Sequence, residues 1–266
     1  MCQSCLPDPN LGQNAVHAAP TERGTGPAAA SADPALIAAV AMANHILVHH
    51  KVLDAFGHVS ARHDQRPDRF LLARNMAPGL VTAADIMEFD LDGAPVNPDA
   101  RKVYLERFIH GEIYRLRPDV MAIVHSHSAS VVPFGVVPSV PLRAVFHMAG
   151  FIGTTTPIFE IREHAGLASD LLIRNRELGV ALAQALGPAP LILMRGHGST
   201  VVGPTLKLAV YRAVFAEINA RLQADALRLG PVTYLTEGEG RATATTNAGQ
   251  IDRAWDLWAA EATGQA

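Results

Sequence analysis

Apolar residues recur at helical spacing in four long stretches of this chain. In residues 33–53 they follow the 3.6-residue period of a helix, Asp33 is a suitable N-cap, and Pro34 fits the first helical position. Each of the other three stretches ends at or before a proline or glycine, as is common where a helix ends. These stretches predict further helices over residues 102–117, 171–187 and 205–229.

Shorter runs rich in strand-forming residues lie between these helices. GHVSARH, RFLLAR and IMEFDLDG (residues 57–63, 69–74 and 86–93) are divided by Pro, Asp and Gly, so they predict a meander of antiparallel strands. VMAIVHSH (120–127) is typical of a buried strand, and PLILMRGHGSTVVG (190–203) of a strand pair around a glycine turn. This mixed order of helices and strands predicts an α/β fold.

The two ends of the chain differ from this central region. Residues 1–32 are low in large apolar residues and have no helical or strand period, so we expect a disordered tail. Its two cysteines, Cys2 and Cys5, have no second pair with which to form a metal site. We expect one domain over residues 33–235, followed by an extension over 236–266. In that extension one helical stripe should dock on the core or on a second subunit, and it consists of Ile251, Ala254, Trp255, Trp258, Ala259 and Ala262.

Charge and composition narrow the choice of partners. The chain has 266 residues, 49% of them hydrophobic, and a formal net charge of −3 with scattered basic residues. Neither nucleic acid nor an anionic membrane is favoured by this pattern, and a small molecule is a better candidate. No stretch reaches the roughly 20 apolar residues of a membrane span, and the start lacks the features of a secretory signal. We therefore expect a soluble, cytoplasmic protein.

Three histidines have the pattern of metal ligands. His125 and His127 are two residues apart at the end of the predicted buried strand, where side chains at that spacing point to the same face. His197 lies between Gly196 and Gly198, which allow the backbone to approach a ligand closely. Three imidazoles with an open position are typical of a catalytic metal site. Polar residues that only mark a strand end and a turn are the structural alternative.

Glu106 is the fourth residue with unusual placement. In the predicted helix it shares a face with Ile109, His110 and Ile113, the stripe that should meet the core. A carboxylate there is partly buried or paired, and its burial would raise its pKa. The alternative is a first-turn glutamate that complements the helix dipole.

Four segments, in this order and spacing, resemble the class II aldolase/adducin family: GHVSAR, DIMEFDLDG, LERFIHGEIYRLRPDVMAIVHSHS and LILMRGHGSTVVG. The resemblance covers roughly residues 35–235. It implies an α/β/α sandwich around a largely antiparallel sheet, assembled as a homotetramer with active sites at subunit interfaces. It also implies that His125, His127 and His197 bind one divalent metal ion and that Glu106 is the acid/base residue.

The chain departs from the sugar-phosphate aldolases of the family where those enzymes hold phosphate. Their G-N-x-S motif reads GHVS here, with His58, and their Ser/Thr-Gly turn reads ARNMAP, with Arg74 and Asn75. Tyr104 and Leu105 replace two small hydroxylated residues before the glutamate. This pattern resembles the branch that decarboxylates hydroxylated aromatic or pyridine dicarboxylates.

In that branch, the resemblance gives the altered residues new roles. Arg74 would bind a substrate carboxylate, with Asn75 beside it, and His58 would supply a proton or a hydrogen bond. Tyr234 falls where family members bring an aromatic residue toward a neighbour's site. A surface arginine and a turn histidine with its hydrogen bonds satisfied are the structural alternatives for Arg74 and His58.

The resemblance thus implies a metal-dependent carbon–carbon lyase, with a decarboxylase favoured. Cleavage leaves an electron pair that must move onto an oxygen, as phenolate or enolate, which a Lewis acid stabilises. Three imidazoles accept zinc or manganese, and iron or cobalt as well. An aldolase for a non-phosphorylated substrate and a non-catalytic adducin-like module are the alternatives. For proton delivery Glu106 is the first candidate and His58 the second.

Overall fold

The computed structural model of the chain describes residues 31–265. The expected tail, with Cys2 and Cys5, falls outside the described residues except for its last two positions. Ala32, the last of these, is buried, and Asp33 caps the first helix by accepting a hydrogen bond from the backbone N–H of Ala35.

A seven-stranded sheet forms the centre of the fold, with strand order β3-β2-β1-β4-β7-β6-β5. Neighbouring strands are antiparallel except for the β5–β6 pair, which is parallel. The predicted meander and the strand pair around the glycine turn are both confirmed. The strands are β1 (His58–Arg62), β2 (Arg69–Ala73), β3 (Ile86–Asp90), β4 (Ala122–Ser126), β5 (Ile158–Phe159), β6 (Leu191–Met194) and β7 (Gly198–Gly203).

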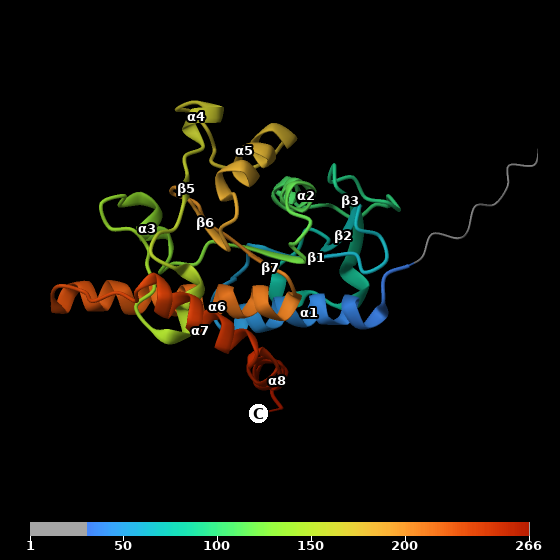
Figure 1. Cartoon of the computed structure of the whole chain (residues 1–266). Coiled ribbons are helices and arrows are strands. Elements are labelled where there is room, and N and C mark those ends of the chain that lie inside the picture. Colours follow the sequence, from blue (N-terminus) through green and yellow to red (C-terminus); the bar gives the residue numbers. More distant parts are fainter. Residues whose placement is uncertain (1–30, 266) are drawn as a thin grey trace, which may run out of the picture. The chain divides into compact units, whose positions relative to one another are not determined.

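Helices cover both faces of this sheet (Figure 1). On one face α1 (Pro34–His49) and α6 (Leu206–Leu229) pack against alternate strand residues such as Val59 and Val124. On the other face α2 (Arg107–Leu116) and α5 (Arg176–Leu186) pack against Ile123 and its neighbours. Successive strand residues point to opposite faces, so each strand contributes to both cores. The α/β/α sandwich around a largely antiparallel sheet is therefore confirmed.

The remaining helices are short and lie in the connections. They are the 3-10 helices η1 (Pro78–Leu80), η2 (Ala83–Asp85) and η3 (His147–Ile152), and the α-helices α3 (Val132–Val136) and α4 (Arg162–Ala165). Among the described residues, no helix combines the length and the apolar content needed to cross a membrane.

Two of the predicted helices begin later than expected. The helix predicted from residue 102 begins at Arg107, because the preceding backbone is held in place by the hydrogen bond from Asn75 N–H to the Lys102 carbonyl. The helix predicted from residue 171 begins at Arg176, where Asn175 caps it by accepting from Leu178 N–H. In both cases side chains and tertiary hydrogen bonds determine the start, and periodicity does not report them.

The C-terminal region adds two helices, α7 (Glu237–Ala248) and α8 (Ile251–Ala262). The predicted apolar stripe of α8 packs on this chain's own core, where Trp258 is buried against Tyr211 and Phe215. Helix α7 has no apolar stripe, so its sequence did not predict it. It begins with a capping box formed by Thr236 and Glu239.

Candidate metal centre

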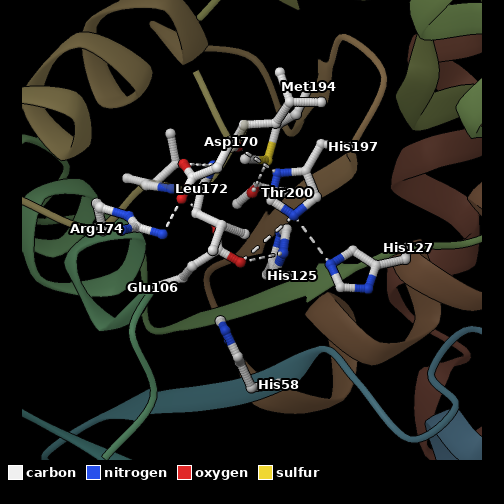
Figure 2. Close-up of polar contacts among 12 residues, drawn as sticks. His58, Glu106, His125, His127, Asp170, Leu172, Arg174, Met194, His197 and Thr200 are labelled. Atoms are coloured by element: carbon white, nitrogen blue, oxygen red, sulfur yellow. Dashed lines mark hydrogen bonds and ion pairs between the residues drawn. The ribbon is translucent and has the colours of Figure 1, made fainter. Parts of the chain in front are cut away.

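Three histidines and one glutamate converge at one end of the sheet (Figure 2). One ligand atom from each of His125, His127, His197 and Glu106 lies within 4.8 Å of the others. They come from the end of β4, the residue after it, the turn between β6 and β7, and the residue before α2. The structure thus brings together the four residues that the sequence singled out.

The sheet explains why these residues meet. Strands β4 and β7 are antiparallel neighbours with Ser126 opposite Ser199, so the end of β4 faces the turn that carries His197. The glycines of this turn are required by its geometry. Gly196 has a positive φ of 67°, and a Cβ atom on Gly198 would collide with the Ser126 carbonyl oxygen.

Backbone carbonyl groups orient two of the imidazoles. His125 Nδ1 lies 3.1 Å from the Ser199 carbonyl oxygen, and His197 Nδ1 lies 2.9 Å from that of Leu171. Since a carbonyl only accepts, each Nδ1 donates a hydrogen, and each Nε2 is the atom directed toward the centre. His127 Nε2 lies 3.0 Å from His197 Nε2, and burial lowers the pKa of His127 to about 4, so its ring is neutral at pH 7.

These residues fit a divalent metal ion. His125 Nε2 is fully buried and has no hydrogen-bond partner among the described residues. A buried polar atom without a hydrogen-bond partner is costly unless a ligand binds to it. Three imidazole nitrogens with a nearby carboxylate form a donor set that zinc and other transition metals accept.

Glu106 is buried and uses its two carboxylate oxygens differently. Oε1 accepts a hydrogen bond from Ile173 N–H at 2.9 Å, while Oε2 lies 3.5 Å from both His125 Nε2 and His197 Nε2. Burial alone would raise the pKa of this carboxyl, but His125 and His197 outweigh it and hold the pKa well below its usual range. The expected rise is therefore wrong, because the apolar stripe is not the carboxyl's nearest environment.

The position of Glu106 also differs from the prediction. It is the N-cap residue of α2, with φ −93° and ψ 19°, and is not within the helix. Its side chain makes no capping hydrogen bond, so it does not serve the helix start. The carboxylate is instead available to the metal centre.

A cavity of about 380 Å³ opens beside the four residues. Its lining is mainly apolar with a few polar groups, which is the usual character of a small-molecule site. It is lined by Ala55, Phe56, Gly57, His58, Asn75, Met76, Ala77, Tyr104, Leu105, Glu106, His127 and Leu172.

His58 lies between this cavity and the metal centre. It is paired with His125 across β1 and β4, and its ring centroid lies 5.1 Å from that of His125 and 4.7 Å from that of Tyr104. Burial, followed by nearby His110 and His125, lowers the pKa of His58 well below its ordinary value. His58 is therefore a neutral imidazole at the cavity wall.

Of the other three predicted substrate residues, one lines the cavity and two do not. Asn75 lines the cavity, whereas Arg74 does not, and its Nε lies 2.7 Å from Asp85 Oδ1. Tyr234 is outside this chain's cavity, where its ring stacks under the Arg143 guanidinium at 3.9 Å. The structure therefore brings Asn75 to the site of the same chain, but not Tyr234.

Glu217 supports the site, although the sequence did not indicate it. It is a buried residue of α6 whose carboxylate accepts hydrogen bonds from the hydroxyl groups of Ser128 and Ser130. These serines follow His127, so Glu217 anchors the loop that carries this ligand. A carboxylate at a buried position of a long helix is the one signal that could have indicated it.

Comparisons with known proteins identify the family of this chain. The model of the class II aldolase and adducin N-terminal domain matches residues 38–224. Decarboxylase tropJ of Talaromyces stipitatus is 39% identical over 82% of this chain and 90% of its own length. A 3,4-dihydroxyphthalate decarboxylase of Arthrobacter keyseri is 29% identical over 72% of this chain and 79% of its own.

Solved structures show the same fold. An L-fuculose 1-phosphate aldolase from Glaciozyma antarctica superposes with a TM-score of 0.70, over 87% of this chain and 91% of that one. Its identity to this chain is 21%, so this likeness concerns the fold alone.

Proposed function

The chain belongs to the class II aldolase and adducin family, and on that basis we propose that it is a metal-dependent decarboxylase of a hydroxylated aromatic or pyridine dicarboxylate. The observation that carries the proposal is the convergence of three imidazoles and Glu106 beside a mainly apolar cavity. The decarboxylases among its relatives support the reaction type. The residues that replace the phosphate-binding groups of the family's sugar-phosphate aldolases favour a planar substrate over a sugar phosphate.

In this proposal His125, His127 and His197 hold the ion. A divalent ion at this position supplies Lewis-acid stabilisation of negative charge that develops on a substrate oxygen. Zinc and manganese both suit the donor set, and iron and cobalt are also compatible with it.

Glu106 moves the proton in the proposed mechanism. Ile173 N–H fixes Oε1, which leaves Oε2 free to take the proton of a ring hydroxyl. Glu106 returns this proton to the ring carbon that bears the carboxylate. As carbon dioxide leaves, the electrons of the broken carbon–carbon bond pass into the ring and onto its oxygen, which solvent reprotonates.

The cavity wall binds and orients the substrate. Tyr104 and Leu105 provide flat apolar surface for a ring, while Asn75 and His58 provide polar groups. Arg74 is held at Nε by Asp85, and no other nitrogen of its guanidinium has a hydrogen-bond partner among the described residues. Arg74 does not line the cavity itself, but its neighbour Asn75 does, and we place the second carboxylate of the substrate on this free edge, at the margin of the cavity.

The test is carbon dioxide release by purified, metal-loaded protein from a panel of hydroxyphthalates and hydroxypyridine dicarboxylates. We expect turnover of at least one member, and its loss when the ion is removed by a chelator. Activity on aldols alone would replace this function with an aldolase. Protein that neither binds nor responds to a divalent ion would favour a non-catalytic module.

We also propose that the working unit is a homotetramer in which Tyr234 approaches a neighbour's cavity. Its ring and the Arg143 guanidinium stacked on it are partly exposed in the single chain. Sedimentation of the protein would determine the number of subunits. A monomer with full activity would remove Tyr234 from the site.

A further inference from the structure

A chain of three hydrogen bonds runs from the cavity wall into the core on one side of the sheet. His58 Nδ1 lies 2.7 Å from His110 Nε2, and His110 Nδ1 lies 2.6 Å from Ser60 Oγ. Ser60 Oγ lies 2.8 Å from the Tyr114 hydroxyl oxygen, where the chain ends. All four residues are at most 3% exposed, so their hydrogen bonds must be satisfied within the protein.

The sequence spacing explains why these residues line up. His58 and Ser60 are two apart on β1 and point to the same face, while His110 and Tyr114 are four apart on α2. Because α2 packs on this face of the sheet, the two pairs interleave. The residues of the chain therefore come from two elements that are fixed by the core.

Each residue in the chain contributes a limited number of hydrogens. Both imidazoles are buried and hydrogen-bond to each other, and among the described residues neither hydrogen-bonds to a carboxylate, so each is neutral and carries one N–H. Ser60 and Tyr114 each carry one O–H. The hydrogens can therefore all point inward or all point toward the cavity. The remaining arrangement, in which Ser60 accepts from both His110 and Tyr114, leaves the Ser60 hydrogen without an acceptor in the described part of the protein.

Tyr114 decides between these two directions. Its hydroxyl has Ser60 as its one hydrogen-bond partner among the described residues. If the hydrogens point inward, Ser60 donates to Tyr114 and the phenolic hydrogen has no acceptor, which costs about 1–3 kcal/mol in a buried place. If they point toward the cavity, the hydrogens of Tyr114, Ser60 and His110 all have acceptors, and that of His58 is on the side of the cavity that its ring lines. The Arg62 guanidinium, 4.7 Å from the Tyr114 ring centroid, also makes this phenol a better donor than acceptor.

We propose that Tyr114, Ser60 and His110 hold His58 in the tautomer that carries its hydrogen on Nε2. His110 donates from Nε2 to His58 Nδ1, so the only hydrogen of His58 is on its other nitrogen. Nε2 of His58 has no partner among the described residues, and the ring lines the cavity. In Figure 2 the ring extends from its strand toward Glu106 and His125. His58 thus presents a donor, and not a base, to the cavity.

This series of hydrogen bonds does not pass protons to the substrate. Such a transfer would leave a phenolate on Tyr114, whose pKa is raised by complete burial. Within residues 31–265, no solvent-exposed residue continues the hydrogen bonds beyond Tyr114 to replace the proton. His58 therefore binds an anionic oxygen of the substrate and Glu106 alone moves the proton. That substrate is a carboxylated aromatic only if the proposed function holds, whereas the tautomer of His58 does not depend on it.

The direct test is nitrogen NMR of protein labelled with ¹⁵N-histidine, recorded metal-free and with zinc at pH 7. The His58 signals are identified by their loss in His58→Gln. We expect the hydrogen on Nε2 and the unprotonated, pyridine-type signal on Nδ1. A hydrogen on Nδ1 of His58 would overturn the proposal, as would a charged ring.

Two variants of His110 test whether this residue fixes the tautomer of His58. His110→Leu removes the donor, so we expect a mixture of His58 tautomers and a fall in kcat/KM on the order of 10- to 100-fold. His110→Gln can donate its amide to His58 Nδ1 and should restore both the tautomer and most of the activity. Full activity and an unchanged spectrum in His110→Leu would show that His110 does not fix the tautomer of His58.

A matched control distinguishes the specific role of His110 from the effect of removing any histidine from a helix. His45 lies on α1, outside the cavity, and has one hydrogen bond to the Val81 carbonyl. His45→Leu should leave the His58 spectrum and activity unchanged. If His110→Leu does not fold, the wild-type spectrum and His110→Gln still decide the matter. The spectra also stand if no tested compound is decarboxylated, which would count against the proposed function alone.

Discussion

Glu106 combines a fixed oxygen with a free one, and this asymmetry suits a proton carrier. Its Oε1 is held by the Ile173 backbone, and its Oε2 faces two imidazoles. The low pKa of the carboxyl means that it starts as an acceptor, so it must take a proton before it can return one. The substrate hydroxyl is the source that the proposed reaction offers.

Glu106→Gln should retain metal but lose turnover. The amide oxygen can still accept from Ile173 N–H, whereas the side chain can no longer carry a proton. We expect kcat to fall on the order of 10²- to 10⁴-fold. Metal content and kcat measured together check this. Glu112→Gln, on the same helix but outside the cavity lining, is the control, and a near-normal rate in Glu106→Gln would remove this residue from the mechanism.

Arg74→Ala should mainly raise KM for a dicarboxylate substrate. The guanidinium would bind the second carboxylate in the ground state and the transition state alike, so its loss leaves kcat nearly unchanged. Arg101→Ala is the matched control, because Arg101 makes the same 2.7 Å contact with an aspartate, Asp99, away from the cavity lining. Equal kinetics in the two variants would show that Arg74 is a surface residue.

At the scale of elements, the site depends on where strands and helices end. The turn between β6 and β7 brings His197 back toward β4, and α2 begins directly after Glu106. A shift of any of these ends by one residue would separate the ligands, since side chains along a strand alternate between faces.

Gly198→Ala should weaken metal binding. The new Cβ atom would collide with the Ser126 carbonyl oxygen, which belongs to the strand that carries His125. The two strands must move apart, and we expect at least a tenfold loss of zinc affinity, measured by competition with a chelator. Gly238→Ala is the control, because nothing lies within 4 Å of its added Cβ. Unchanged affinity in Gly198→Ala would show that the turn adapts.

Trp258→Ala should destabilise the fold without emptying the site. Trp258 attaches α8 to the core at Tyr211 and Phe215, and loss of a buried tryptophan costs about 3–5 kcal/mol. Urea unfolding measures this cost, and metal content should stay the same. Leu257→Ala, at a position that is 51% exposed, should change stability by no more than about 0.5 kcal/mol.

At the scale of the whole molecule, the candidate metal centre lies where two layers meet. The three histidines come from the end of β4, the residue after it and the β6–β7 turn, and Glu106 directly precedes α2 of the helical layer. An ion bound there joins segments that are far apart in the sequence, so binding and folding are coupled.

Metal removal should therefore lower the stability of the whole fold. An ion at 100 times its Kd adds about 2.7 kcal/mol to the free energy of unfolding. We expect a chelator to lower Tm and added zinc or manganese to restore it. In a His125→Ala variant the chelator should have no effect. A Tm that is the same with and without the ion would show that these residues bind no metal.

The sequence by itself determined the order of elements and singled out the four residues that the structure brings together. Hydrophobic periodicity depends on local geometry, so α1, α6, α8 and the strands could be read from it. The H-x-H at a strand end and the glycine-flanked histidine, together with the family pattern, indicated that His125, His127 and His197 would lie close together, which the structure shows.

The tertiary structure alone decided the environment of each side chain. That Glu106 has a lowered pKa, that Arg74 is paired with Asp85, and that helices begin at Arg107 and Arg176 all result from contacts between distant segments. Which ring nitrogen of His58 carries the hydrogen depends on Tyr114, 56 positions away in a different element. Periodicity and residue type cannot report such properties, because they arise only when the layers pack.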